Sequence, residues 1–110
     1  MGEVVEGIFR PNDSLTNMIL AAMREQGHGL GERLLMSLRL RVLSRDKRLE
    51  LERAIAAKLA QDVEGGLVSL PVGSAIEGGV YVGDWRDLFE WFMENWPAIL
   101  EMILAIIALF

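Results

Sequence analysis

The sequence of 110 residues carries a formal net charge of −5, contains no cysteine and is 52% hydrophobic. Its length suits one small domain, or a domain with an appendage, and its apolar content argues against a disordered chain. Without cysteine the chain has neither a disulfide framework nor a thiolate metal site.

The chain is acidic in total, but its central segment is basic. Between Arg24 and Lys58, nine basic residues stand against five acidic ones, whereas the rest of the chain has two basic and eleven acidic residues. Opposite charges on different parts of one small chain favour contact between subunits. We therefore expect a homo-oligomer or membership of a larger protein assembly.

The N-terminal segment predicts an extended piece followed by a short helix. Residues 3–9 are short but have β-branched character, and Pro11 follows them, so we expect an edge strand or arm there. Asp13 or Ser14 is placed to cap a helix that Gly27 ends, with apolar residues at helical spacing between them. No basic leader with a long apolar stretch opens the sequence, so we expect no secretory signal.

The central segment, residues 32–64, holds neither glycine nor proline. This absence permits a single helix of about 33 residues, roughly 50 Å long. When residues 32–64 are divided into heptads, they have nine core positions, and seven of the nine are apolar. This pattern predicts an amphipathic helix whose core positions form a seam between subunits, with charged residues at the other two positions. The seam residues are Leu35, Leu38, Val42, Arg45, Leu49, Glu52 and Leu59. The opposite charges of Arg45 and Glu52 suit an antiparallel or staggered pair.

Two other interpretations of the central segment stay open. Ser44 is suited to cap a second helix after a break, which would give a helical hairpin with Arg45 and Glu52 facing water. The alternation of leucine, arginine and valine over residues 38–42 also suits a strand. We favour the helix, either continuous or in two segments.

A glycine pair closes the helical assembly region, residues 1–66. Two β-branched runs, residues 67–72 and 80–82, then flank a glycine-bearing loop, and they predict a small β-ribbon or an extended linker over residues 67–83. Because an isolated two-stranded ribbon is marginal in water, we expect a helix or a neighbouring subunit to lie against it.

The C-terminal region, residues 84–110, is the most apolar part of the chain and holds six of its eight aromatic residues. Asp84 is placed to cap a helix over residues 85–110, which Pro97 interrupts, because proline suits the first turn of a new helix. Three uses are open for this helix. In the first, the helix lies in a membrane interface. In the second, its strip of acidic residues faces other copies of the chain. In the third, it packs as a core helix against the central helix.

A chain this short offers limited apolar surface with which to cover the C-terminal helix. We therefore expect this helix to attach the protein to membrane lipid or to an apolar partner. The expected anchors are Trp85, Phe89, Trp91, Phe92, Trp96, Ile99, Ile103 and Ile107. A simple span is not expected, because the run from residue 96 to residue 110 is about 22 Å of helix, short of a hydrocarbon core of roughly 30 Å.

Few residues are suited to catalysis or metal binding. His28 is the only histidine, and it lies between two glycines, a setting typical of a turn. The glycine-rich residues 27–31 follow a predicted helix rather than the strand that precedes a phosphate-binding loop. We expect no enzyme, no cofactor, no metal site and no small-molecule substrate.

The alternative function is nucleic-acid binding or packaging through the basic cluster between Arg39 and Arg53. Its candidate contacts are Arg39, Arg41, Arg45 and Arg48, whose guanidinium groups suit phosphate. Acidic residues interleave with these arginines and no aromatic residue lies among them, so a solvated helix face is the favoured interpretation.

These patterns together predict a mainly α protein. Its elements are a short N-terminal helix, a long central amphipathic helix with or without a break, a small β-ribbon or extended linker, and a hydrophobic C-terminal helix. We expect a structural role as an oligomeric component of a phage virion or of a membrane complex, in which the central helix pairs subunits and the C-terminal helix attaches the assembly.

Overall fold

The computed structural model describes the backbone of residues 2–107 and the side chains of residues 14–107. The described chain is mainly α, which confirms the predicted fold class. Its helices are α1 (Gly2–Glu25), α2 (Leu30–Arg41), α3 (Arg45–Glu64), the 3₁₀ helix η1 (Trp85–Leu88), α4 (Phe89–Glu94) and α5 (Trp96–Ile107), and its strands are β1 (Ala75–Glu77) and β2 (Val80–Val82). The predicted end of the last helix, residues 108–110, lies outside the described residues.

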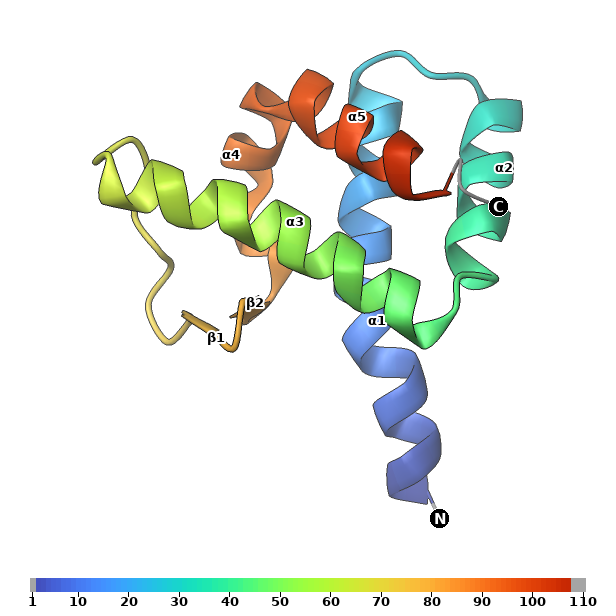
Figure 1. Cartoon of the computed structure of the whole chain (residues 1–110). Helices are drawn as coiled ribbons and strands as arrows, with labels where there is room; N and C mark the ends of the chain where they lie inside the picture. The colour runs from blue at the N-terminus through green and yellow to red at the C-terminus, as the bar shows by residue number, and fades with distance from the viewer. Residues whose placement is uncertain (1, 108–110) are drawn as a thin grey trace.

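The elements pack around one hydrophobic core (Figure 1). Helix α5 lies along α3, α1 contacts α2, η1 and α4, and β2 packs against α3. The largest fully buried side chains come from α1, α3, α4 and α5; they are Leu15, Met18, Ile19, Leu51, Ile55, Leu59, Phe92, Ile99 and Ile103. Segments from both ends of the chain therefore share a single apolar interior.

Helix α1 is longer than the sequence predicts. Residues 3–9, expected as an edge strand or arm, are helical, and the helix continues past Pro11. The strand expectation is wrong because the hairpin lies elsewhere and leaves this segment without a strand to pair with. The predicted end is confirmed: Gly27 has φ +89°, and the amide of His28 donates to the carbonyl oxygen of Met23 at 2.9 Å.

The central segment is two helices rather than one. The hydroxyl of Ser44 accepts a hydrogen bond from the amide of Lys47 at 3.2 Å and caps α3, which confirms the interpretation with a break. The continuous helix and the strand over residues 38–42 are both wrong. A straight helix of about 50 Å would also exceed the greatest extent of the molecule, 39 Å. The break lets α2 pack on α1 while α3 packs on α5.

The predicted ribbon forms, but its first strand is displaced. Strands β1 and β2 pair antiparallel with Glu77 opposite Val80, and Gly78 and Gly79 between them adopt φ of 60° and 80°. Two central residues with positive φ make the tight turn that favours hairpins. The strand therefore lies within the expected loop, and residues 67–72 are not a strand; proline at position 71 has no amide hydrogen for a ladder.

The C-terminal region breaks where Pro97 predicts. Helix α4 ends at Glu94, the amide of Ile99 donates to the carbonyl oxygen of Asn95 at 3.0 Å, and Pro97 lies in the first turn of α5. Upstream, the carboxylate of Asp84 accepts a hydrogen bond from the amide of Arg86 at 2.9 Å and caps η1, as expected.

Candidate functional site

The expected anchor residues of the C-terminal region lie mostly inside the protein. Seven of the eight are buried, namely Trp85, Trp91, Phe92, Trp96, Ile99, Ile103 and Ile107. Only Phe89 reaches the surface, with 37% of its area exposed. The acidic strip remains in water, because Glu90, Glu94 and Glu101 are all exposed. The arrangement within this chain is thus the third of the three alternatives, a core helix.

The premise behind the anchors, that the chain is too short to cover its C-terminal helix, is wrong. Helix α3 supplies Leu51, Ile55 and Leu59 to the shared core, and α1 supplies Leu15 and Ile19. Helix α5 is buried because α3 lies along it and side chains of α1 fill the same core, although both come from segments far away in the sequence. No helix among residues 2–107 has both the length and the apolar character needed to cross a membrane. Attachment through this helix stays a prediction.

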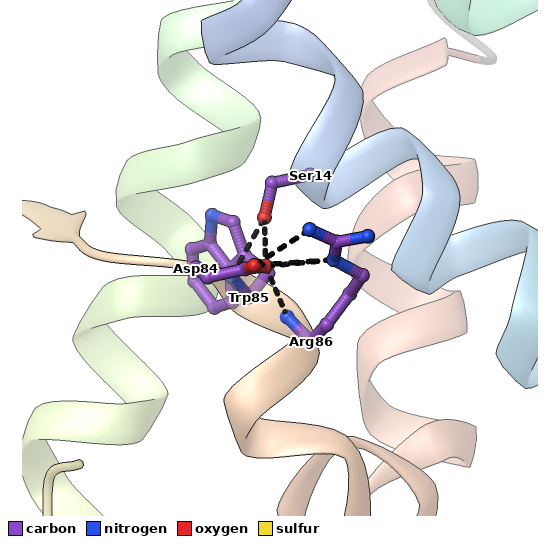
Figure 2. A network of polar contacts seen from close by, with 4 residues as sticks. All are labelled: Ser14, Asp84, Trp85 and Arg86. Atoms are coloured by element: carbon purple, nitrogen blue, oxygen red, sulfur yellow. Dashed lines mark hydrogen bonds and ion pairs between the residues drawn. The ribbon is translucent and has the colours of Figure 1, made fainter.

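Two polar contacts fasten the C-terminal region to the rest of the fold. The indole Nε1 of Trp91 donates to the carboxylate of Asp62 at the end of α3, at 2.8 Å. On the other side, Figure 2 shows Ser14 of α1 beside the start of η1. The hydroxyl of Ser14 donates to Asp84 Oδ1 at 2.9 Å and accepts from the amide of Trp85 at 2.7 Å.

At the contact between Ser14 and Asp84, several hydrogen bonds hold the carboxylate of Asp84. The side chain of Arg86 donates to both oxygens of Asp84, at 2.8 to 3.1 Å. Hydrogen bonds from the Arg86 side chain, the Arg86 amide and the Ser14 hydroxyl hold the pKa of Asp84 well below its ordinary value, since each favours the charged form. This group of residues joins α1 to η1 and offers no nucleophile or bound-ligand geometry.

The predicted oligomer seam is divided by the break between α2 and α3. Its first three residues, Leu35, Leu38 and Val42, are exposed along α2 and the turn after it. Further on, Leu49 is exposed and Leu59 is in the core, so the seam is not one continuous surface. This corrects the seam: its a and d positions shared a face only on the assumption of an unbroken helix.

The two charged seam residues lie in different surroundings within the chain. Arg45 is exposed, whereas Glu52 accepts a hydrogen bond from Arg48 Nε at 3.3 Å. Arg48 is itself buried, with 8% of its area exposed, and its guanidinium also donates to Thr16 of α1 at 3.0 Å. Arg48 therefore links α3 to α1 and is removed from the candidate nucleic-acid contacts.

The other candidate nucleic-acid contacts, Arg39, Arg41 and Arg45, are exposed. Arg39 and Arg41 are two residues apart on one helix, which turns their side chains roughly 200° from each other. A basic surface of the kind that tracks a phosphate backbone needs its cations on one side. The geometry therefore gives the nucleic-acid interpretation less support than the sequence did, and it stays a prediction.

The feature that stands out is the outer side of α2. Five aliphatic side chains lie there at helical spacing, and each exposes between 52 and 69% of its area. They are Leu30, Leu34, Leu35, Leu38 and Val42. We call this surface the α2 apolar face. The opposite side of the helix packs inward through Met36 and Leu40. Helix α2 is thus apolar on two sides and buries only one of them.

Sequence reasoning missed part of this surface. Leu30 and Leu34 lie outside the heptad core positions, so the seam did not include them. The signal was nevertheless present, because a helix that carries leucine on all sides has more apolar surface than one core can cover.

The remaining chemistry is limited. His28 Nδ1 lies 3.4 Å from Glu32 Oε1, and the His28 ring meets the edge of Trp96, so the histidine is part of the packing at the start of α2. Within residues 14–107, no three side chains of the histidine, cysteine or carboxylate type are grouped to hold a metal ion. Comparison of the chain with protein-family models, curated proteins and solved structures finds no match.

Proposed function

We propose that this protein is a non-enzymatic structural component that works by self-association, and that the α2 apolar face is the surface through which copies meet. One observation carries the proposal: five aliphatic side chains lie side by side on α2 and stay in water, while the opposite side of the same helix is buried. A surface of this kind is stabilised when a partner removes it from water.

The size of the surface supports the proposal. The five exposed side chains present on the order of 500 Å² of apolar area, within the range in which the largest patch on a monomer is often functional. Scattered exposed aliphatic residues are ordinary on soluble proteins and need no explanation. Here, however, the residues are contiguous on one helix, which distinguishes them from isolated residues such as Leu67 and Val72 in the loop before the hairpin.

Subunit pairing, expected along residues 32–64, is thereby confined to α2, and the C-terminal helix takes no part in it. The anchors of the C-terminal helix already pack against α1 and α3, so a partner that bound them would have to displace that packing. The α2 apolar face needs no such rearrangement. Contact through a preformed surface avoids the free energy of opening the core.

The test is the mass of the protein in solution, measured by sedimentation over a range of concentrations. We expect the wild type to approach a multiple of its chain mass of 12.3 kDa as concentration rises. Leu38→Asp places a charge at the centre of the α2 apolar face, and we expect it to sediment as a monomer with unchanged helical circular dichroism.

Val72→Asp is the matched control, because Val72 is fully exposed in a loop outside α2. We expect this variant to associate like the wild type. A wild-type chain that stays monomeric at millimolar concentration, or equal weakening of association by both substitutions, contradicts the proposal.

A further inference from the structure

Charge is distributed unevenly along α2, the helix that bears the α2 apolar face. Its first turn holds the acidic residue Glu32, and its last turn holds Arg39 and Arg41. The Glu32 side chain is 66% exposed even though its Oε1 accepts a hydrogen bond from the Gly29 amide at 3.1 Å. Arg33 follows Glu32 but projects to another side of the helix, so the charges that matter are the single residues Glu32 and Arg39, which attract each other when two copies run in opposite directions.

The positions of these charges around the helix agree with that orientation. Glu32 and Arg39 are seven residues apart, so at about 100° per residue they project within roughly 20° of each other. Both lie on the side of Leu35, along one edge of the α2 apolar face. A two-fold rotation perpendicular to the helix reverses its direction and keeps this edge on the same side. Glu32 of each copy then lies beside Arg39 of the other.

We propose that two copies of this chain pair through the α2 apolar face, with the two α2 helices antiparallel about a two-fold axis near the middle of the helix and Glu32 of each copy paired with Arg39 of the other. This inference rests on the proposed function, self-association through α2, and adds the partner, the symmetry and the orientation. A parallel pair would bring the basic ends of both helices together, which like charges disfavour.

The area is sufficient for such a pair. Two copies that each cover on the order of 500 Å² of apolar surface bury about 1,000 Å² in total, where specific interfaces begin. Helix α2 lies at the edge of the molecule, with α1 packed on its inner side (Figure 1). The outer side is therefore accessible to a second copy. An interface of this size is expected to dissociate on dilution.

The absence of cysteine allows a direct test by disulfide cross-linking of the full chain. In the antiparallel pair with Glu32 opposite Arg39, positions 31 and 42 of different copies lie on the facing sides of the two helices, within about 3 Å of each other along the axis. Both positions accept a cysteine: a Cβ at Gly31 would meet nothing within 4 Å, and Val42 is largely exposed. Like positions are far apart, because in this register the two Val42 sites lie about 20 Å from each other along the helix axis, and the two Gly31 sites about 13 Å.

The experiment compares Gly31→Cys alone, Val42→Cys alone and an equimolar mixture of the two, oxidised at a concentration at which the wild type is a dimer by sedimentation. We expect a cross-linked dimer in the mixture and little in either single variant, since a disulfide needs Cβ atoms about 4 Å apart. Efficient cross-linking of Val42→Cys alone, or a mixture that does not cross-link, overturns the antiparallel pairing while the dimeric wild-type mass still supports the proposed function. A monomeric wild type overturns both.

Discussion

Helices α2 and α5 have the same length, 12 residues, but differ in how much of their apolar surface the fold buries. Helix α5 contains a single charged residue, Glu101, yet its large side chains are mostly buried. Helix α2 contains four charged residues, yet it leaves four leucines in water, and Val42 directly after it is exposed as well. The total apolar content of a helix therefore does not predict which surface stays free. What matters is how many sides the rest of the fold covers.

The coverage differs because the two helices have different neighbours. Helix α5 packs on α3 and meets α4, and the shared core includes side chains from α1. Helix α2 lies at the edge of the molecule and packs chiefly on α1. A helix with neighbours on one side can bury only one stripe. Any apolar residue on its other side becomes surface, and on α2 those residues form a contiguous patch.

The largest expected effect comes from a charge placed inside α5. Ile103 is fully buried, so Ile103→Asp introduces an unpaired carboxylate into the core and should lower the free energy of unfolding by more than about 4 kcal/mol. Urea denaturation followed by circular dichroism measures this change. Leu104→Asp, at a neighbouring position that is 45% exposed, is the control and should change stability by less than about 1 kcal/mol. Equal losses would mean that α5 is not packed as described.

An intermediate effect is expected from the charges that flank the α2 apolar face. Arg39→Glu sets two acidic side chains against each other at each end of the proposed pair and should weaken dimerisation about tenfold, with stability of the monomer little changed. Dilution series by sedimentation give the dissociation constant. The double variant Glu32→Arg with Arg39→Glu should recover most of the lost affinity. Failure of the second substitution to restore association contradicts the pairing of these two residues.

Arg41→Glu is the matched control for the charge reversal. Arg41 lies in the same last turn of α2 but on the other edge of the α2 apolar face. It is not opposite Glu32 in the proposed pair, so reversing its charge should change the dissociation constant less than Arg39→Glu does, and Glu32→Arg should not compensate for it.

The smallest effect is expected at the contact between α1 and η1. Asp84→Asn keeps an oxygen that can cap η1 but removes the negative charge that pairs with Arg86, and should cost about 0.5 kcal/mol at neutral pH. The folded state lowers the pKa of Asp84, so its charge stabilises the fold above the ordinary carboxyl pKa, and this contribution is lost as the pH falls below about 4. The difference in unfolding free energy between wild type and variant should therefore shrink in acid.

Urea titrations at neutral pH and in acid measure this difference. Arg86 lies in water and holds the carboxylate from the exposed side, so added salt should also reduce the effect. A difference that grows as the pH falls would contradict the stabilising role of the charged carboxylate. Loss of dimerisation in Asp84→Asn would contradict the separation between this contact and the α2 apolar face.

Local signals in the sequence predicted most of the boundaries. Ser44 starts α3, Gly27 follows the end of α1, Asp84 caps η1 and Pro97 lies in the first turn of α5. These positions were predictable because each depends on a residue and its immediate neighbours, through a side-chain cap or a restricted backbone. The first strand was misplaced because two β-branched runs resembled strands, whereas the Gly78–Gly79 turn fixed the pairing.

The sequence by itself determined that this protein is helical, where several of its helices begin or end, and that it has more apolar side chains than one helix face can hide. Only the tertiary structure decided which of them are hidden. Ile99 and Ile103 enter the core because α3 lies along α5 and side chains of α1 fill the same interior, while Leu34 and Leu38 stay outside because no described element lies over them. Burial depends on contacts between residues far apart in the chain, and periodicity within one helix carries no information about those contacts.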